Sequence, residues 1–110
     1  MEFYRGNDFY FDIGAELEED GSVFEFNVGD IIKVGIKDKL SNTNYVLFKE
    51  IEVTEKTDTI SIHFTNEETK KFSEGDKILE VELTEKLNGA VSTIYQDKLT
   101  IKGEVIKWVR

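Results

Sequence analysis

The sequence predicts an all-β protein, and three observations carry that prediction. Apolar and polar side chains alternate in short runs along nearly the whole chain, which is the period of a strand with one buried face. The chain has no proline, so glycine and Asx residues must form its turns. No stretch has the sustained 3.6-residue period of a long amphipathic helix.

The alternation indicates seven or eight short strands. It is clearest at the first one, where Phe9, Phe11 and Ile13 fall on one face and Tyr10 and Asp12 on the other. The expected strands cover residues 9–17, 24–28, 32–36, 45–53, 60–64, 79–83, 91–95 and 99–105. Each strand buries one face, so two sheets must pack face to face or one sheet must close on itself.

Two local signals refine this picture. Thr65 and Glu68 have the spacing of a capping box, which predicts one helical turn between residues 65 and 72. Asn88 and Gly89 predict a hairpin, because both residue types tolerate positive φ. We therefore expect a single domain over residues 1–110, built as an immunoglobulin-like antiparallel β-sandwich of seven or eight strands. Alternation does not distinguish this sandwich from a small closed β-barrel, which is the alternative.

Composition excludes several classes of function. The chain has 14 Lys and Arg against 23 Asp and Glu, a formal net charge of −9. Phosphate binding needs a field of the opposite sign, so nucleic acid and anionic membranes are poor partners. Cysteine is absent, which excludes disulfides and thiolate chemistry. We expect no signal peptide and no transmembrane segment, since no apolar run approaches the required length.

The residues give no specific sign of catalysis. A Ser-His-Asp site would need the one histidine, His63, which we expect on the solvent face of a strand beside Ser61 and Thr65. The acidic turn Glu18–Asp20 offers oxygen ligands but lacks the spacing of an EF-hand loop. Neither glycine-rich phosphate-binding motif occurs. We expect no enzymatic activity, no cofactor and no metal site.

Aromatic side chains gather near both ends of the chain. Core packing accounts for Phe9 and Phe11, whereas Phe3, Tyr4 and Trp108 lie outside the clear alternation. Large aromatic side chains dominate the energetics of protein interfaces. Phe3, Tyr4 and Trp108 are therefore candidate contacts with a partner, and the alternative is that they cap the ends of the sandwich.

The order of the motifs resembles a known family. Arg5-Gly6-Asn7-Asp8 runs directly into the aromatic strand 9–13, and Asp30 opens the strand 31–37. In the second half, Phe-Ser-Glu-Gly-Asp at 72–76 leads into the strand 79–83, and residues 89–105 close the pattern. This order resembles the N-terminal β-sandwich domain of baseplate upper proteins from tailed phages of Gram-positive bacteria, and related small prophage proteins.

The resemblance implies a non-enzymatic structural or assembly protein of a phage or prophage, associated with the tail or baseplate. It would act through protein–protein contacts, in the virion or in the host cytoplasm during assembly. Its partners would be other phage structural proteins or further copies of itself, since open sheet edges favour self-association. The alternative is a small acidic interaction module, or a regulator that binds a basic site on a host protein.

Overall fold

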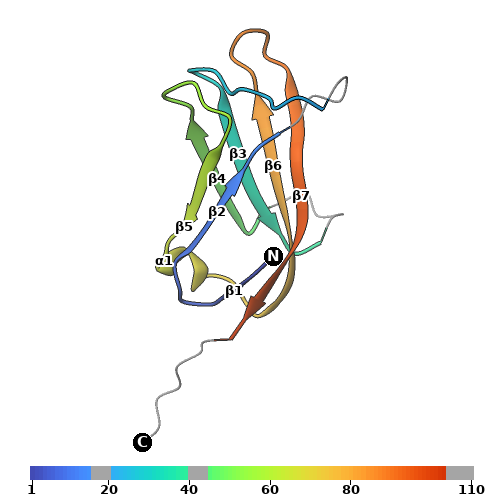
Figure 1. The fold of residues 1–110 in the computed structure, drawn as a ribbon. Helices are drawn as coiled ribbons and strands as arrows, with labels where there is room; N and C mark the ends of the chain where they lie inside the picture. The colour runs from blue at the N-terminus through green and yellow to red at the C-terminus, as the bar shows by residue number, and fades with distance from the viewer. Residues whose placement is uncertain (16–20, 40–44, 104–110) are drawn as a thin grey trace, which may run out of the picture.

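The computed structural model describes residues 1–15, 21–39 and 45–103, which form seven strands and one helical turn (Figure 1). The strands are β1 (Glu2–Tyr4), β2 (Phe9–Ile13), β3 (Ile31–Lys37), β4 (Leu47–Glu52), β5 (Ile60–Phe64), β6 (Gly75–Thr84) and β7 (Val91–Lys102), and the helical turn α1 is Asn66–Thr69. The prediction of an all-β protein is confirmed.

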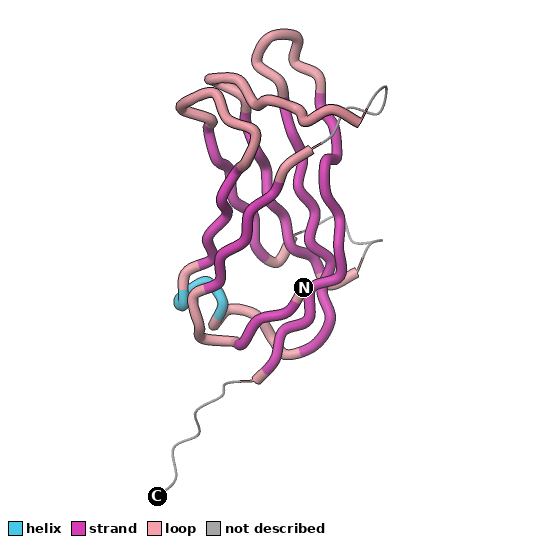
Figure 2. The backbone as a smooth tube through the Cα atoms, in the orientation of Figure 1, coloured by secondary structure: helices cyan, strands magenta, loops and turns pink. Residues whose placement is uncertain are grey.

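The strands form two sheets. The larger sheet has the order β1-β7-β6-β3-β4, and the smaller sheet pairs β2 with β5. Figure 2 shows the two strands of the smaller sheet lying over one face of the larger sheet. Neighbouring strands are antiparallel except for β1, which runs parallel to β7. The expectation of purely antiparallel sheets is therefore wrong at this edge.

The core lies between the two sheets, and strand alternation predicts its side chains except for Phe3 and Phe72. The larger sheet contributes the buried side chains Ile32, Val34, Ile36, Leu79, Val81, Leu83, Leu99 and Ile101. The smaller sheet contributes Ile13, Ile60, Ile62 and Phe64. All of these belong to one apolar cluster, and burying each such side chain contributes roughly 1.5–3 kcal/mol. Packing of the two inner faces thus supplies the main stabilisation of the fold.

One expected strand is absent. Residues 24–28 form only an isolated bridge, between Phe26 and Thr57. The alternation of aromatic side chains stops at Val28, which is exposed, and Gly29 turns the chain away at a φ of +94°. Because a ladder needs several successive pairs, this segment passes the ends of the two sheets without joining either of them.

Strand β7 is continuous, although the sequence suggested two strands at 91–95 and 99–105. The expected gap at 96–98 is filled by regular pairing, with Asp97 opposite Leu79. A β-bulge at Ile94 lies within the first expected strand and shifts its phase, so Ser92 and not Thr93 lies opposite the inward-facing Leu83. The β6–β7 hairpin is confirmed, with a longer connection than a two-residue turn. The Glu85 N–H donates to the Ala90 carbonyl at 2.9 Å, and Gly89 alone in this connection has positive φ.

The chain passes from the larger sheet to the smaller sheet at residues 5–8, which we call the Arg5–Asp8 corner. Gly6 turns there with a φ of +88°. The buried Thr69 hydroxyl accepts a hydrogen bond from the Gly6 N–H at 3.0 Å and donates to the Asn7 carbonyl at 2.9 Å. The Asp8 carboxylate accepts a hydrogen bond from the Asn66 N–H at 2.6 Å. Helical turn α1 therefore holds the corner in place.

The predicted helical turn is confirmed, with its capping box. Thr65 and Glu68 exchange the two reciprocal side-chain to backbone hydrogen bonds. Lys49, from the edge strand β4, donates to Glu68 at 2.9 Å and to the His63 carbonyl at 2.6 Å. A lysine that points inward from β4 therefore links the larger sheet to the end of β5.

Replacing Thr69 by valine tests the corner, because valine has nearly the same shape but no hydroxyl. The Gly6 N–H and the Asn7 carbonyl would lose their partner, and each of these part-buried hydrogen bonds contributes about 0.5–1.5 kcal/mol. We expect Thr69→Val to lower the free energy of unfolding by about 1–3 kcal/mol in urea denaturation. Thr69→Ser keeps the hydroxyl and should cost about 1 kcal/mol. Equal losses in the two variants would contradict the role of the hydroxyl.

The capping carboxylate makes stability depend on pH. Burial alone would raise the pKa of Glu68, but hydrogen bonds from Thr65 and Lys49 outweigh it and hold that pKa below its ordinary value. A carboxyl group with a depressed folded-state pKa stabilises the fold above its unfolded-state pKa. This contribution is lost as the pH falls through the folded-state pKa.

We therefore expect urea denaturation to show that Glu68→Gln loses less stability than the unchanged protein between about pH 5 and about pH 2. Glu67→Gln, on the same helical turn, is the control and should follow the unchanged protein. If the free energy of unfolding depended on pH in the same way in all three proteins, the prediction would be refuted.

Candidate functional site

His63 does not form a catalytic group with its neighbours. Its ring stacks on Tyr10 with the centroids 4.1 Å apart, and its Nε2 lies 3.6 Å from the Asp8 carboxylate. The Ser61 hydroxyl donates to Asp12 at 2.6 Å, not to the imidazole. These side chains form a row of polar contacts on the outer face of the smaller sheet, and the row does not align a nucleophile with a base.

Within residues 1–15, 21–39 and 45–103, no three His, Asp or Glu side chains are grouped so that they could hold a metal ion. The predicted acidic turn Glu18–Asp20 lies outside the described residues. In the same ranges, no helix has the length and apolar character needed to cross a membrane.

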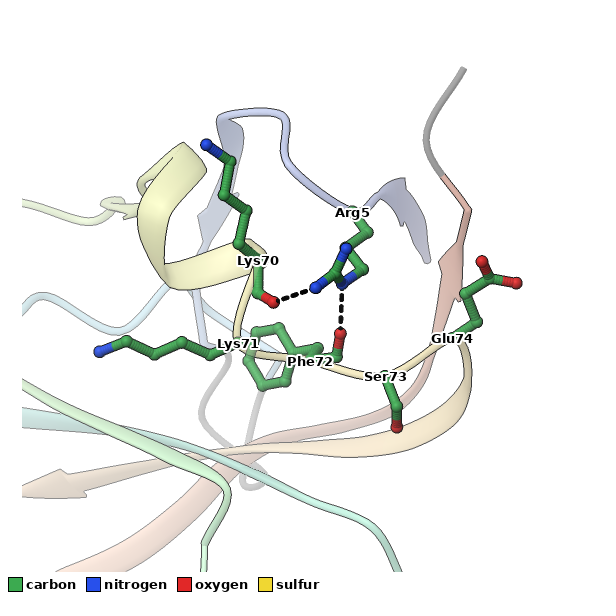
Figure 3. A pocket seen from close by; sticks show the side chains of 6 residues that line it. All are labelled: Arg5, Lys70, Lys71, Phe72, Ser73 and Glu74. Atoms are coloured by element: carbon green, nitrogen blue, oxygen red, sulfur yellow. Dashed lines mark hydrogen bonds between the residues drawn. The ribbon is translucent and has the colours of Figure 1, made fainter. Parts of the chain in front are cut away.

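A shallow hollow of about 530 Å³ opens beside the Arg5–Asp8 corner, lined by Arg5 and residues 70–74 (Figure 3). Arg5 donates hydrogen bonds to the carbonyls of Lys70 and Phe72, both at 2.8 Å. The side chains of Lys70 and Lys71 extend away from the guanidinium. The three cations therefore do not converge on one ligand position, and the hollow is the outer side of a structural corner.

The structure describes two of the three aromatic residues predicted as contacts, and they differ in exposure. Phe3 is 5% exposed, and its ring stacks on Phe9 with the centroids 4.8 Å apart. It is a core residue, which corrects the expectation that it contacts a partner. Tyr4 is 40% exposed, and the Lys102 ammonium lies 5.4 Å from its ring centroid. Trp108 lies outside the described residues.

A second aromatic pair, which the sequence did not single out, lies on the outer face of the larger sheet. Tyr45 is 36% exposed, Phe48 is 48% exposed, and their ring centroids are 5.6 Å apart. We define the outer-face patch as this pair with the charged side chains beside it on β3, β4 and β6. Its members are Tyr45, Phe48, Lys33, Lys37, Glu50, Glu80 and Glu82.

Gly35 makes room for the Tyr45 ring. It lies in β3 directly opposite Phe48 on one side and Glu80 on the other. A Cβ atom at Gly35 would overlap the Tyr45 ring, so the ring rests on the bare backbone of β3. Glycine inside a strand often marks such a close approach. Gly35 therefore positions the Tyr45 ring, although a glycine weakens the interior of a strand.

Glu80 is the polar centre of the outer-face patch. It accepts hydrogen bonds from Tyr45 at 3.3 Å and Gln96 at 2.9 Å, and its carboxylate lies 3.1 Å from the Lys37 ammonium. Burial alone would raise the pKa of Glu80, but the hydrogen bonds from Lys37 and Gln96 together hold it below its ordinary value. Burial raises the pKa of the Tyr45 hydroxyl, and the negative charge of Glu80 raises it further.

Charges of both signs border the aromatic pair. Lys33 on β3 lies directly opposite Glu50 on β4 and Glu82 on β6. With Lys37 and Glu80, the patch has two lysines and three glutamates, so its formal charge is 2 − 3 = −1. An aromatic centre with a charged border is the usual anatomy of a protein-binding surface.

Comparisons of the chain with protein-family models, with curated proteins and with solved structures found no match. The class of protein is therefore proposed below from the fold, the outer-face patch and the order of motifs.

Gly35→Ala tests the placement of Tyr45. The added methyl group would push the ring off the strand and away from Glu80, so the pKa of Tyr45 should fall toward the ordinary value for tyrosine. An NMR titration with labelled tyrosine measures this change. Tyr95 is the internal control, because burial and Asp97 raise its pKa independently of Gly35. A Tyr45 pKa that does not change in the variant would contradict this account.

Proposed function

We propose that the chain is an immunoglobulin-like β-sandwich. The strand order supports this, since β3, β6 and β7 adjoin as strands C, F and G do in that fold, and β4 adds to them as C′ does. Strands β2 and β5 pair as B and E do. A closed barrel would need strand pairing between the two sheets, and the described strands have none.

We propose that the protein is a non-enzymatic structural or assembly component of a tailed phage or prophage, associated with the tail or baseplate. It would dock on other phage structural proteins through the outer-face patch, in the virion or in the host cytoplasm during assembly. The observation that carries the docking function is the exposed pair Tyr45 and Phe48. The assignment to a phage particle rests on the order of motifs in the sequence.

The aromatic pair suits docking because it is fixed before a partner arrives. Tyr45 is held by its contact with Gly35 and by its hydrogen bond to Glu80, and Phe48 lies against it. A side chain that is already ordered loses less conformational entropy on binding. Aromatic anchors of this kind carry a large share of the binding energy at protein interfaces.

A small acidic module that binds a host protein is the second candidate function. The formal net charge of −9 favours it, because an acidic surface can occupy the basic site of a nucleic-acid enzyme. Such binding would depend on total charge and weaken steeply with salt. Docking through Tyr45 and Phe48 would depend mainly on the two rings.

Phe48→Asp tests the docking face. We expect this variant to enter particles, or assembly intermediates, from prophage-carrying cells at least about tenfold less than the unchanged protein, by quantitative mass spectrometry. Leu87→Asp is the matched control, since it makes the same charge change at a 93% exposed position on the β6–β7 turn. Thermal unfolding should show that both variants remain folded.

Two results would count against the assignment. Absence of the unchanged protein from particles and intermediates would contradict a structural or assembly role. Recovery of a nucleic-acid enzyme from host lysate, with equal loss in the Phe48→Asp and Leu87→Asp variants, would favour the acidic module.

A further inference from the structure

Among the described residues, strand β2 pairs with another strand on one edge only. Its sheet consists of β2 and β5 alone, because β1, which precedes β2 in the chain, pairs with β7 instead. In an antiparallel ladder, every second residue turns its N–H and C=O groups away from the partner strand. Within the described residues, β2 therefore presents a row of backbone donors and acceptors on the side opposite β5.

The edges of β4 and β5 carry features that oppose strand addition. Lys49 points inward from β4 and donates to the His63 carbonyl of β5, so one ammonium group occupies the seam between these edges. Glu50 and Glu52 lie on the exposed side of β4. Inward-pointing and charged residues are the usual means by which edge strands avoid pairing.

Strand β2 has less of this protection, because no charged side chain points inward from it. Phe9, Phe11 and Ile13 face inward and are apolar, and Tyr10 and Asp12 face outward. The one charged residue of the strand therefore lies on the outer face and not toward the core. Phe9 and Phe11 are only half-buried although they pack against the core, so additional apolar cover would remove more of their surface from water.

We propose that β2 is a homodimer interface, where a second copy of the chain adds its own β2 in antiparallel orientation. The two-fold axis passes between the Phe11 residues of the two copies. The two smaller sheets then join as one sheet of order β5-β2-β2-β5. In a two-fold interface the same patch of each copy contacts the other, so the side-chain register must complement itself.

The sequence of β2 satisfies this condition. With Phe11 opposite Phe11 of the second copy, Tyr10 lies opposite Asp12 and Phe9 lies opposite Ile13, each pair occurring twice. Residues directly opposite on neighbouring strands share one face, so the phenol and the carboxylate meet on the outer side. The apolar pairs meet on the inner side. No like charges face each other in this register.

Antiparallel pairing of two copies about a two-fold axis is unfavourable at β4. An axis at Lys49 sets two lysines directly opposite each other, and an axis at Glu50 sets two glutamates opposite. Like charges directly opposite on neighbouring strands are destabilising. Like charges therefore disfavour self-pairing of β4 in both central registers. In self-pairing of β2 the opposed side chains complement each other.

The proposed dimer is independent of the docking function. The outer-face patch belongs to the larger sheet, and β2 belongs to the smaller sheet, so either surface can be occupied while the other is free. Dimerisation would also be measurable in the pure protein, without any phage component.

Analytical ultracentrifugation of the full chain over a range of concentrations tests the dimer. We expect a monomer–dimer equilibrium that tightens between about 50 mM and about 500 mM NaCl, because salt screens the repulsion between copies that each carry a formal charge of −9. A strict monomer at the highest attainable concentration at both salt levels would overturn the proposal.

A pair of variants at Tyr10 tests the register. The side chain is 66% exposed, so the variants should fold, which thermal unfolding would verify. Tyr10→Asp places carboxylates opposite Asp12 at both pairs and should raise the dimer dissociation constant at least about tenfold. Tyr10→Lys places ammonium groups there and should preserve the dimer. Both variants lose the stack on His63, so that loss cannot account for a difference between them.

Leu87→Asp and Leu87→Lys are the controls, because they change the net charge equally at a 93% exposed position on the β6–β7 turn, outside β2. Equal weakening by Tyr10→Asp and Leu87→Asp would show a net-charge effect and refute the β2 interface. Equal weakening by Tyr10→Asp and Tyr10→Lys would refute the register.

Discussion

The passage of the chain from one sheet to the other at the Arg5–Asp8 corner governs the rest of the structure. Because β1 is committed to β7, β2 begins the smaller sheet with β5 as its partner. The corner is held by polar groups distant in sequence. Arg5 reaches the carbonyls of Lys70 and Phe72, and Thr69 bonds to Gly6 and Asn7, across 62 to 67 positions. The placement of the first strands therefore depends on the segment around α1, and so does the edge that β2 leaves open.

Alternation in the sequence predicts the parts of the fold whose stability comes from apolar burial. Ile32, Val34 and Ile36 face the core as their spacing indicates, and the capping box at Thr65 and Glu68 is formed. Strand β1 could not be predicted this way, because a three-residue strand with one inward side chain has no period to detect. Phe24 and Phe26 alternate as in a strand, and yet they form no ladder, because the chain turns nearby at Gly29, which has positive φ.

The candidate site is harder to predict than the fold, because it depends on register. Tyr45 and Phe48 look like ordinary strand residues until Gly35 is known to lie opposite Phe48 and beneath the Tyr45 ring. The two residues are three apart, a spacing that would put them on opposite faces of a regular strand. They share a face because Tyr45 precedes β4 and its ring lies over Gly35 of β3, which local spacing does not reveal. Phe3 was the natural candidate by sequence, being aromatic and outside the alternation. It is buried, because the corner folds β1 back against Phe9.

The distribution of charge favours aromatic docking over mimicry of nucleic acid at the outer face. The carboxylates of this face are partly matched within the sheet, since Lys37 pairs with Glu80, Lys98 with Asp76 and Lys102 with Glu2. Lys33 lies between two more glutamates, and the outer-face patch has a formal charge of only −1 although the chain has −9. A face on which half of the carboxylates are in ion pairs projects less field toward a basic partner than the net charge of the chain suggests. In the proposed docking, affinity would come from the two rings, and the surrounding charges would orient the partner.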